Sequence, residues 1–525
     1  MTERRNLIIT GFMGTGKSSV AARVAQRIGR PFVDMDELIV QRAGRTIPEI
    51  FSQFGEGAFR QIERGLCEEL SMREGVVIAT GGGCLVDERN RELLMRNGWV
   101  VCLDCEAEAI VQRLQGDQGR PMLWGDSPEQ RVRDLLAQRY AAYNQIPQHI
   151  DTTSRTVEEV VEAVMQLFGA RPVAWPVRTP TGSYLVHLIP GGLALMGDLL
   201  KAQRVTSDPV VVSDEHVWPL YGATVMESLR ARGYRPASVT LPAGERHKTL
   251  DTVRLLYDRF IEAGLDRGGA VIALGGGVVT DTAGLAAATY LRGVRLVQAP
   301  TSLLGMIDAS VGGKVAVDHP RGKNLIGAFV EPLLVLLDTD TLASLPEIER
   351  QAGLAEIIKA GVIADPELFA MLEEGSQQPE MREIIGRALQ VKIDVVEEDP
   401  YEQGRRAVLN LGHTFAHAYE VLEGYGLHHG LAVSIGMAKA ALLAEQRGLC
   451  TAETRARIVA ALRAHGLPVD APEHDPEAVY EAMFADKKRR GSRLRFVLPR
   501  AIGDVVIADD LPAEQVIEVL RRDTP

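Results

Sequence analysis

Four of the chain's 11 histidines lie in one segment, Leu409–Gly430, with the sequence LNLGHTFAHAYEVLEGYGLHHG. His413 and His417 stand four residues apart, so on a helix they share one face. His428 and His429 follow after a Gly-Tyr-Gly break that turns the chain. Imidazoles brought together in this way suit a metal ion that keeps one open coordination position. A polar surface cluster would contain the same residue types, so this segment by itself leaves both interpretations open.

A second chemical signal is the segment Gly11–Ser18, GFMGTGKS, which fits the pattern G-x-x-x-x-G-K-[ST]. A short buried-strand pattern precedes it and an amphipathic helix pattern follows, which is the context that a phosphate-binding loop needs. The glycines let backbone N–H groups close on phosphate oxygens, while Lys17 reaches the β- and γ-phosphates and Ser18 ligates Mg²⁺. The predicted ATP site consists of Gly14, Thr15, Gly16, Lys17, Ser18 and Ser19.

Further polar residues in the first third suit a small substrate. Asp34 and Asp36 stand two apart on a predicted strand and therefore on the same side of it. Asp34 suits the Mg²⁺ shell and Asp36 could accept a substrate hydroxyl, although a helix cap or a surface carboxylate would look the same. Arg60 opens a predicted helix and can pair with an anionic substrate.

Glycine-rich segments surround these residues. Gly81–Gly83 ends a second predicted strand and lets a small ligand approach the backbone closely. The segment 115–125, QGDQGRPMLWG, is polar and Gly-rich. It is interpreted as a mobile lid whose Arg120 reaches over the phosphates. Arg139 lies on the helix that follows.

Residues from about 5 to 168 resemble the shikimate kinases. The resemblance lies in the ordered motifs GFMGTGKS, FVDMD, FRQIE, TGGG, GRPML and QRYAAY. It implies that shikimate is held by Asp36, Arg60, Gly82 and Arg139, and that Arg120 and Arg155 contact ATP. Lys17, Asp36 and Arg120 are then the expected catalytic residues. A gluconate-type kinase of the same fold is the alternative, and the two arginines Arg60 and Arg139 favour a substrate with a carboxylate.

The chain is expected to divide after this first part. Residues 171–180 include three prolines and show neither helical nor strand period, which predicts a semi-rigid linker. We therefore predict a kinase domain at 1–170, a linker at 171–180, a cofactor-binding α/β part at 181–345 and a helical part at 346–525.

The α/β part has its own anion signals. A buried strand pattern at 271–274 runs into Gly275–Asp281, GGGVVTD, and then into a helix of small residues. Strand, glycine turn and helix can hold a dinucleotide pyrophosphate. Thr280 stands where the last glycine of G-x-G-x-x-G would be, so the motif alone is a weak signal.

Lysines and a buried acid follow downstream. Lys314 and Lys323 lie in a Gly-rich stretch with Asp308 and Asn324, which fits a phosphate- or carboxylate-bearing ligand, although solvated surface charge is the alternative. Beyond residue 346 the patterns are mostly helical. There, Glu356 and Lys359 share one face of an otherwise apolar helix, where a carboxylate is costly unless it is paired or bound to metal.

Residues from about 180 to 520 resemble 3-dehydroquinate synthases. The resemblance lies in LPAGERHK, LGGGVVTD, PTSLL, SVGGKVAV, GKNLIGAF, GLAEIIK, LNLGHTFAHA, the HHG turn and ADKK. It implies a divalent metal, zinc or cobalt, on Glu356, His413 and His429, with His417 facing the substrate. It implies NAD held by Asp214, Glu245, Lys248, Gly276, Gly277, Val278, Val279, Thr280, Asp281, Thr301, Ser302, Lys314, Lys323, Thr341 and Ser344. It further implies substrate contacts from Asp308, Asn324, Lys392 and Lys487, and catalytic roles for Lys314, Lys359, Arg406 and His417.

The resemblance also implies a mechanism. The metal would bind two adjacent hydroxyls of 3-deoxy-arabino-heptulosonate 7-phosphate and lower their pKa. NAD would accept and return a hydride with no net redox, and phosphate would leave by β-elimination before an aldol closes the carbocycle. Two positions depart from the family: Leu431 stands where many members carry Glu, and Thr280 replaces the usual Gly. An aminocyclitol-type sugar-phosphate cyclase and a polyol dehydrogenase are the alternatives.

Bulk properties agree with a bifunctional enzyme. A chain of 525 residues predicts two to four domains, and a net charge of −12 disfavours nucleic acid or an anionic membrane as a partner. Five cysteines form no evident disulfide framework, and neither an N-terminal signal nor a bilayer-spanning run is found, so we expect a cytoplasmic protein. The expected fold class is α/β: a P-loop kinase with a parallel sheet and helices on both sides, joined to an NAD-binding α/β part and an all-helical metal-binding part. The synthase resemblance implies a homodimer; a fusion with one non-catalytic half is the remaining alternative.

Overall fold

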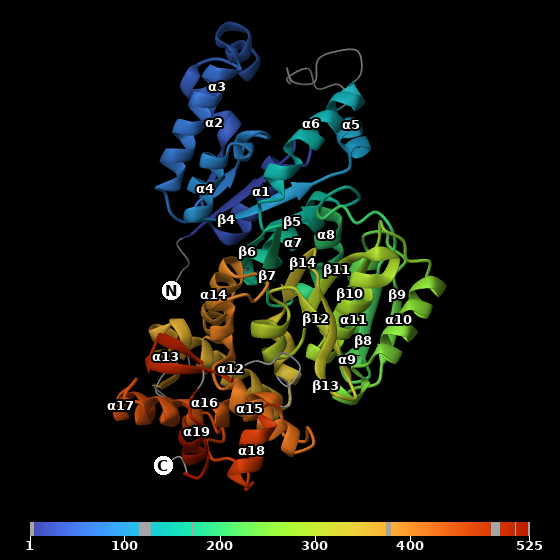
Figure 1. Cartoon of the computed structure of the whole chain (residues 1–525). Helices are drawn as coiled ribbons and strands as arrows, with labels where there is room; N and C mark the ends of the chain where they lie inside the picture. The colour runs from blue at the N-terminus through green and yellow to red at the C-terminus, as the bar shows by residue number, and fades with distance from the viewer. Residues whose placement is uncertain are drawn as a thin grey trace. The chain divides into compact units, whose positions relative to one another are not determined.

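The computed structural model describes residues 5–114, 128–170, 173–373, 380–484, 494–509 and 511–522. The chain forms two compact units that are each described separately (Figure 1). The first unit comprises Met1–Ala174, Ala194–Thr206 and Val225–Tyr234, and the second comprises Trp175–Leu193, Ser207–Thr224 and Arg235–Pro525.

The first unit is built on a parallel sheet with the strand order β2-β3-β1-β4-β5. The central strand β1 is buried along its whole length, so both faces of the sheet are covered. Short apolar runs ending in glycine or a polar residue produce these strands. Their bounds are Asn6–Gly11 (β1), Phe32–Asp34 (β2), Val77–Ala79 (β3), Gly98–Asp104 (β4) and Gln148–Asp151 (β5).

Helices with one apolar stripe pack on this sheet. In α1, Val20 and Val24 are fully buried, and α3 begins with a capping box between Thr46 and Glu49. α3 bends at Gly55, which has a φ of 78°. The helices are α1 (Lys17–Ile28), α2 (Met35–Ala43), α3 (Ile47–Ser71), α4 (Glu88–Arg96), α5 (Ala107–Leu114), α6 (Pro128–Tyr143), α7 (Val157–Ala170) and α8 (Met196–Ala202), with a short 3₁₀ turn η1 at Cys84–Val86.

The second unit contains a larger sheet in the order β6-β7-β14-β11-β10-β8-β9. The pairs from β7 through to β9 are all parallel. The strands are β6 (Val173–Thr179), β7 (Gly182–Leu188), β8 (Val210–Asp214), β9 (Ala237–Leu241), β10 (Ala270–Gly275), β11 (Arg295–Pro300) and β14 (Leu334–Leu337). The connecting helices are α9 (Trp218–Arg230), α10 (Leu250–Glu262) and α11 (Gly277–Thr289), and an antiparallel hairpin joins β12 (Lys314–His319) to β13 (Gly322–Phe329).

The predicted linker at 171–180 needs a correction, because most of it forms the strand β6. This strand stands at the end of the strand order, next to β7. Pro176 lies within it, and a proline without an N–H is tolerated at a sheet edge. The prolines that led to the prediction of a linker are therefore compatible with an edge strand.

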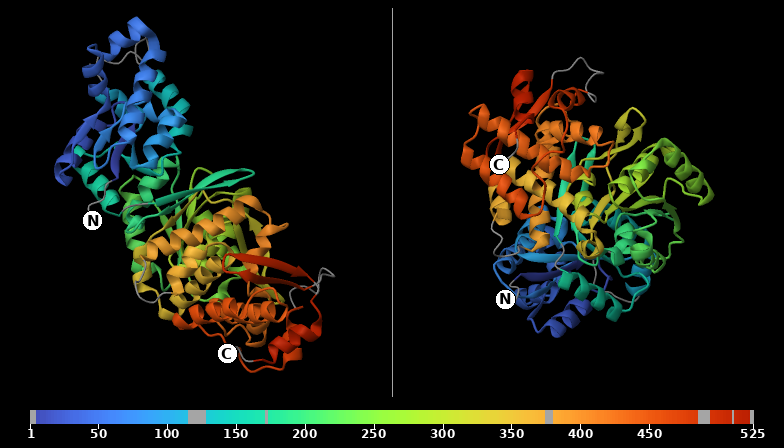
Figure 2. Two further views of the ribbon diagram at one scale, coloured as in Figure 1. Left: turned by 90° about the vertical axis from the view of Figure 1, so that its left-hand side faces the viewer. Right: turned by 90° about the horizontal axis from the view of Figure 1, so that it is seen from below.

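The last part of the chain is mainly helical, as expected. Its helices are α12 (Glu347–Ala364), α13 (Pro366–Glu373), α14 (Met381–Glu398), α15 (His413–Leu422), α16 (His429–Gln446), α17 (Ala452–Ala464), α18 (Pro476–Ala482) and α19 (Ala513–Leu520). A hairpin of β15 (Arg495–Ala501) and β16 (Asp504–Asp509) adds an element that the helical prediction left out. Figure 2 shows this red hairpin beside the helices, where β15 contacts α16 and β16 contacts α12.

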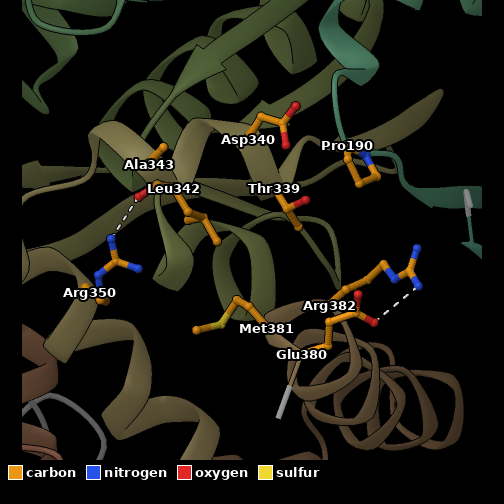
Figure 3. A pocket seen from close by; sticks show the side chains of 9 residues that line it. All are labelled: Pro190, Thr339, Asp340, Leu342, Ala343, Arg350, Glu380, Met381 and Arg382. Carbon is orange, nitrogen blue, oxygen red and sulfur yellow. Dashed lines mark hydrogen bonds and ion pairs between the residues drawn. The ribbon is translucent and has the colours of Figure 1, made fainter. Parts of the chain in front are cut away.

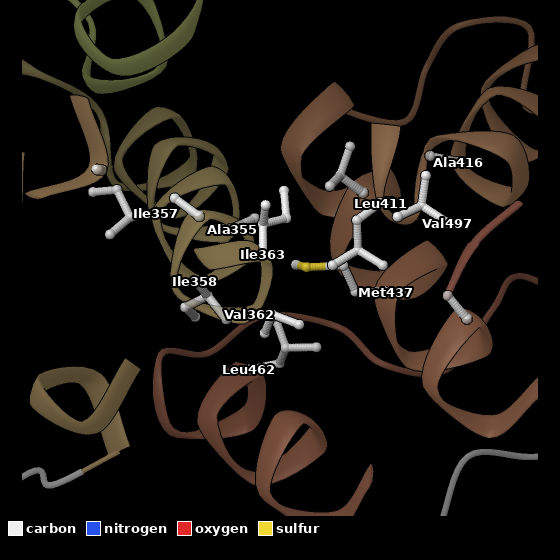
Figure 4. Close-up of a cluster of buried hydrophobic side chains, with 14 of the residues drawn as sticks. Ala355, Ile357, Ile358, Val362, Ile363, Leu411, Ala416, Met437, Leu462 and Val497 are labelled. Atoms are coloured by element: carbon white, nitrogen blue, oxygen red, sulfur yellow. The ribbon is translucent and has the colours of Figure 1, made fainter. Parts of the chain in front are cut away.

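The core of this part is centred on α12 and α16. Ile358 and Val362 of α12 are fully buried among apolar side chains, with Met437 of α16 and Leu462 of α17 close by (Figure 4). Both helices are buried nearly all round, which is typical of a helix in the middle of a domain. The predicted fold class is confirmed. Within the described ranges, the structure contains no helix that is long and apolar enough to cross a membrane.

Gly436 tests how closely α16 packs. A Cβ at Gly436 would lie 2.1 Å from the carbonyl oxygen of Gly412, which is backbone and cannot move aside cheaply. We expect Gly436→Ala to lower the free energy of unfolding of the second unit by about 1–3 kcal/mol, the cost of overpacking a core. Thermal and denaturant unfolding measure this. Gly182→Ala is the control, because its Cβ would meet nothing closer than 3.7 Å; equal effects of the two substitutions would contradict the prediction.

Candidate active sites

The P-loop joins β1 to α1 in the first unit. Gly14 and Gly16 have φ angles of 79° and 91°, a left-handed conformation that favours glycine. α1 begins at Lys17 without a side-chain cap and without an acidic residue in its first turn. The N–H groups of that turn are therefore left for an anion. Ser18 and Ser19 are exposed at the same end of the helix.

Phe12 organises the remaining P-loop side chains through its carbonyl oxygen. Thr15 Oγ1 donates to this oxygen at 2.8 Å and Lys17 Nζ donates to it at 2.9 Å. Thr15 and Lys17 are buried. Lys17 therefore folds back along the loop in this structure, in place to exchange the carbonyl for a phosphate oxygen.

Asp34 fills the helix-cap role that the sequence left as an alternative. Its Oδ1 accepts the N–H groups of Asp36 at 2.9 Å and Glu37 at 3.3 Å, which begins α2. The same turn aims Asp36 at the glycine segment, since a Cβ at Gly81 would lie 2.9 Å from Asp36 Oδ1. Capping thus positions the carboxylate expected to meet the substrate.

Arg60 and Glu63 of α3 also lie against this glycine segment. The two side chains pair on one face of α3, and Glu63 is 1% exposed. Burial raises the pKa of Glu63, and the charge of Arg60 only partly offsets this. A Cβ at Gly83 would lie 2.9 Å from both terminal nitrogens of Arg60. The guanidinium of Arg60 therefore lies close to the backbone at Gly83.

Arg139 reaches the glycine segment from α6. Its Nη1 donates to the carbonyl oxygen of Gly82 at 2.8 Å, and Tyr143 OH donates to the same oxygen. The Arg139 guanidinium also lies over the Phe12 ring, 5.3 Å from its centroid. Asp36, Arg60 and Arg139, which were predicted to contact shikimate together with Gly82, therefore converge on the segment Gly81–Gly83 beside the P-loop.

The other arginines differ in their placement. Arg120, with the predicted lid, lies outside the described residues. Arg155 pairs with the buried Asp198 at 2.9 Å, so a contact with ATP would require it to leave this pair. Arg113 was not predicted, yet its Nη1 lies 3.5 Å from the carbonyl oxygen of Gly14 and its Nη2 donates to that of Thr152.

In the second unit, Glu356, His413 and His429 come together. Nε2 of His413 lies 3.9 Å from Glu356 Oε1, and Nε2 of His429 lies 3.8 Å from the same oxygen. Ligands about 2.1 Å from a tetrahedral ion stand roughly 3.4 Å apart, so these separations are close to those of a bound metal. Glu356 Oε1 is buried and has no hydrogen-bond partner in the described structure. An orphaned carboxylate oxygen facing two imidazole nitrogens fits a divalent cation.

The protonation of His413 agrees with this fit. Burial lowers the pKa of His413 well below its usual value, and the nearby charge of Lys359 lowers it further. A neutral imidazole is the form that binds metal. Lys359 itself pairs with the other oxygen of Glu356, three residues along α12.

The remaining predicted substrate residues are mostly paired with carboxylates. Lys392 of α14 pairs with Asp308, and Lys314 pairs with Glu402 at 2.5 Å. Burial alone would raise the pKa of Asp308, but Lys392 and Lys359 together keep it well below its usual range. Arg406 is buried and donates to the carbonyl oxygens of Pro400 at 2.6 Å and Gly312 at 3.1 Å. Lys487 lies outside the described residues.

His417 lies beside the predicted metal ligands His413 and His429. Its ring centroid is 5.5 Å from that of His413 and 6.1 Å from that of His429. It is exposed, unlike the buried Glu356. This placement is compatible with the predicted role facing the substrate.

The predicted cofactor residues gather at the carboxyl ends of β8, β10 and β11. Gly276 caps α11 without a side-chain bond, so the first turn of α11 is left for an anion, as in α1. Lys248 Nζ lies 2.6 Å from Asp281 Oδ2 and donates to Asn324 at 2.6 Å. Asp214 Oδ1 accepts the N–H of His216 at 2.8 Å at the end of β8.

Other predicted cofactor residues lie on neighbouring turns. Thr301 and Ser302 follow β11 and are buried. Thr341 and Ser344 belong to a 3₁₀ turn at Thr339–Ser344, where Ser344 Oγ lies 2.5 Å from the hydroxyl of Tyr221. Glu245 is exposed, and Gly277, Val278 and Val279 form the first turn of α11.

The structure shows where the two departures from the family pattern, Thr280 and Leu431, lie. Thr280 is fully buried in α11 and satisfies its hydroxyl on the carbonyl oxygen of Gly277 at 3.0 Å. Leu431 is partly buried and packs against the apolar core of the helical part. Neither side chain replaces a proposed ligand.

Two further features lie apart from the predicted site residues. Cys102, Asp104 and His149 cluster in the first unit, but Asp104 already holds His149 at 2.7 Å and burial keeps the pKa of the Cys102 thiol well above its usual value. A surface pocket of the second unit contains none of the predicted site residues, and its Arg350 donates to a backbone carbonyl at 3.0 Å (Figure 3).

Comparisons with known proteins identify the families to which the two units are similar. Residues 13–168 match the shikimate kinase family, residues 238–352 match the N-terminal part of 3-dehydroquinate synthase, and residues 353–489 match its C-terminal part. The 3-dehydroquinate synthase of Nostoc punctiforme is 43% identical over 355 residues, which are 66% of this chain and 98% of that protein. The chain belongs to the 3-dehydroquinate synthase family. With its shikimate kinase domain, it is a bifunctional enzyme of the shikimate pathway, as predicted.

Two further relatives allow the sequence identities to different sugar-phosphate cyclases to be compared. The 3-dehydroquinate synthase of Geobacter metallireducens is 48% identical over 344 residues, covering 64% of this chain and 96% of that one. The solved structure of 2-epi-5-epi-valiolone synthase from Streptomyces hygroscopicus, with NAD⁺ and Zn²⁺ bound, is 32% identical with a TM-score of 0.60. It covers 66% of this chain and 98% of that one. Sequence identity is thus higher to the 3-dehydroquinate synthases than to this cyclase.

Besides Arg113, sequence reasoning missed three residues of the bifunctional enzyme. Glu63 stands three residues after Arg60, which is a pairing distance on a helix and was a readable signal. Glu402 and Glu420 hold Lys314 and Lys323, and these pairs join segments far apart in the chain, so no local spacing could reveal them.

The Arg60 pairs provide a test in the kinase domain. We expect Glu63→Gln to raise the KM for shikimate about tenfold or more, because it removes the buried charge that orients Arg60. Steady-state kinetics with varied shikimate and varied ATP measure this, and the KM for ATP should change little. Glu56→Gln is the control, since Glu56 pairs with the same arginine at 3.0 Å but is 52% exposed. Equal effects on the two substrates, or equal effects of the two variants, would contradict the assignment.

Proposed function

We propose that the first unit transfers a phosphoryl group from ATP to shikimate at the P-loop. The first turn of α1 and Lys17 would hold the phosphates, with Ser18 and the second oxygen of Asp34 toward Mg²⁺. Mg²⁺ would supply charge neutralisation at the β- and γ-phosphates. Arg60 and Arg139 would hold the substrate carboxylate, and Asp36 would accept the proton of the attacking hydroxyl. The convergence of these three side chains on Gly81–Gly83 supports this orientation.

We further propose that the second unit converts 3-deoxy-arabino-heptulosonate 7-phosphate to 3-dehydroquinate. The observation that carries this proposal is the orphaned Oε1 of Glu356 between the Nε2 atoms of His413 and His429. A divalent zinc or cobalt ion held there would supply a Lewis acid for the substrate hydroxyls. NAD at the end of β10 would supply a hydride acceptor that is regenerated in each cycle.

The chain's own residues would then position the substrate. Lys392 is partly buried and pairs with Asp308, while Arg406 is buried and donates to the carbonyl oxygen of Gly312, so both cations suit the phosphate or the carboxylate. Lys314 would be available once a substrate anion replaces Glu402. His417 would move a proton at the exposed side of the metal ligands. Burial of Glu356 and Lys359 excludes water from the other side.

An aminocyclitol-type cyclase is the competing function of this unit, because the valiolone synthase has the same fold. Such a substrate lacks the carboxylate. The higher identity to 3-dehydroquinate synthases, 43–48% against 32%, favours the heptulosonate substrate. Product analysis with both substrates decides: turnover of a carboxylate-free sugar phosphate in preference to the heptulosonate phosphate would overturn the proposal.

We also infer a cytoplasmic homodimer. All five cysteines are free thiols, which suits a reducing compartment. The synthase part is the expected dimer contact. Light scattering of the full chain at several concentrations tests the assembly, and a mass of one chain throughout would refute it.

Paired substitutions test the two-site proposal. Lys17→Ala should lower the shikimate kinase kcat at least about 100-fold, the usual cost of removing one transition-state contact, and leave the synthase unchanged. Glu356→Ala should lower synthase activity by about 100-fold or more through loss of metal and leave the kinase unchanged. Each activity serves as the folding control for the other variant. If either substitution abolished both activities or the wrong one, two separate sites would be excluded.

Metal removal provides an independent test. Dialysis against a chelator, followed by excess Mg²⁺, should leave phosphorylation of shikimate intact and remove the synthase activity. Zinc or cobalt added back should restore it, because both suit a site of two imidazoles and a carboxylate. Full synthase activity in the stripped protein with Mg²⁺ alone would contradict the metal assignment.

A further inference from the structure

Glu420 is a buried carboxylate that the proposed reaction does not use. It lies on α15, seven residues after His413, and is 2% exposed. Burying a carboxylate costs several kcal/mol unless partners compensate it. Its partners are His429 of α16 and Lys323 of β13, which can offset this cost.

One oxygen of Glu420 serves both partners. Oε1 lies 3.3 Å from Nδ1 of His429, at the start of α16, and 3.4 Å from Nζ of Lys323, on β13. Lys323 also lies 4.8 Å from the centroid of the Tyr425 ring and 4.0 Å from Glu245. Glu420 therefore joins the β12–β13 hairpin to the helix that begins with a proposed metal ligand.

The contact with His429 decides which nitrogen faces the metal. A neutral imidazole has one N–H and one lone pair. If Nδ1 donates its hydrogen to Glu420, the lone pair is on Nε2, the atom that lies 3.8 Å from Glu356 Oε1. Metal-bound histidines are commonly oriented by such a carboxylate behind the ring.

His413 makes an instructive contrast. Its Nδ1 lies 3.2 Å from the carbonyl oxygen of Leu411, so a backbone group orients that ring. Backbone acceptors cannot be removed by substitution, whereas Glu420 can. Of the two histidine ligands, His429 is thus the one whose orientation depends on a side chain.

We propose that Glu420 is a positioning residue that orients His429 toward the metal and holds Lys323 beside it. This inference rests on the proposed ligands Glu356, His413 and His429. It adds a coupling: the lysine expected at the cofactor and one metal ligand share a single carboxylate oxygen. A change in the position of Lys323 should therefore also affect the position of His429, and the reverse.

A second geometry must be distinguished from this one. His417, Glu420 and His429 also offer ligand atoms within 4.8 Å of one another. In that geometry Glu420 would itself bind the metal and Glu356 would not. Substitutions separate the two, because a ligand and a positioning residue differ in how much metal affinity they carry.

The experiment measures zinc affinity of the full, metal-stripped chain by competition with a chromogenic chelator, without any assay of activity. Glu420→Ala should weaken zinc binding about 10–100-fold, the usual effect of removing a carboxylate behind a histidine ligand. Glu420→Gln keeps the shape and one acceptor oxygen, so it should weaken binding less, about threefold or more. If the alanine variant does not fold, the isosteric glutamine variant decides alone.

Glu349→Gln is the matched control. Glu349 faces the neighbouring histidine, His428, at 3.6 Å, but both are about 40% exposed and neither is a proposed ligand. Its zinc affinity should equal that of the wild type. The absorption spectrum of bound Co²⁺ gives a second readout, which should shift for Glu420→Gln and stay unchanged for Glu349→Gln.

The outcomes separate this inference from the proposed function. His413→Ala must abolish tight zinc binding; if it does not, the proposed ligands are wrong. If His413→Ala abolishes binding but Glu420→Gln matches Glu349→Gln in affinity and spectrum, the positioning role alone is refuted. If Glu420→Ala and His417→Ala abolish binding while Glu356→Ala does not, Glu420 is a ligand and the positioning role is refuted as well.

Discussion

The synthase unit depends on one energetic constraint, the burial of the Glu356 carboxylate inside an apolar helix. A charge removed from water costs several kcal/mol unless its partners are well placed. Lys359 satisfies one oxygen, and the other faces His413 and His429 without a hydrogen bond. The second oxygen is therefore a buried acceptor without a hydrogen bond, which a divalent cation would satisfy. Placing this oxygen between His413 and His429 requires α12, α15 and α16 to come close together.

Glycines next to the ligands allow that meeting. His413 follows Gly412, whose Cβ would lie 2.8 Å from the backbone nitrogen of Met437. His429 precedes Gly430, whose Cβ would lie 2.3 Å from the carbonyl oxygen of Ala352. Each histidine is also the first residue of its helix. His413 therefore lies next to the contact of α15 with α16, and His429 next to the contact of α16 with α12. Ligand placement and helix packing are thus the same constraint at these positions.

The sequence predicted what depends on short spacing and missed what depends on tertiary contacts. The P-loop and the histidine segment carry their chemistry within a few residues, and the metal set was completed by the resemblance, not by spacing. Asp34 shows what spacing cannot decide: it caps α2, and the same residue at the same place was also predicted to bind Mg²⁺. β6 was mistaken for a linker because prolines hide an edge strand. Glu420 could not be found, since its partners lie 9 and 97 residues away.

The chain has a net charge of −12, so an anion-binding site needs a local cluster of cations. In the synthase unit such a cluster of lysines is stabilised by neighbouring carboxylates in the absence of substrate. Lys314, Lys323 and Lys392 each face a carboxylate of the chain: Glu402, Glu420 and Asp308 respectively. These carboxylates offset the repulsion among the lysines and hold each one in a defined position. In the proposed reaction a substrate phosphate or carboxylate would replace Glu402 at Lys314, so this lysine would need little reorganisation. Glu402, Glu420 and Asp308 add to the negative charge of the chain and at the same time position the lysines of the proposed anion site.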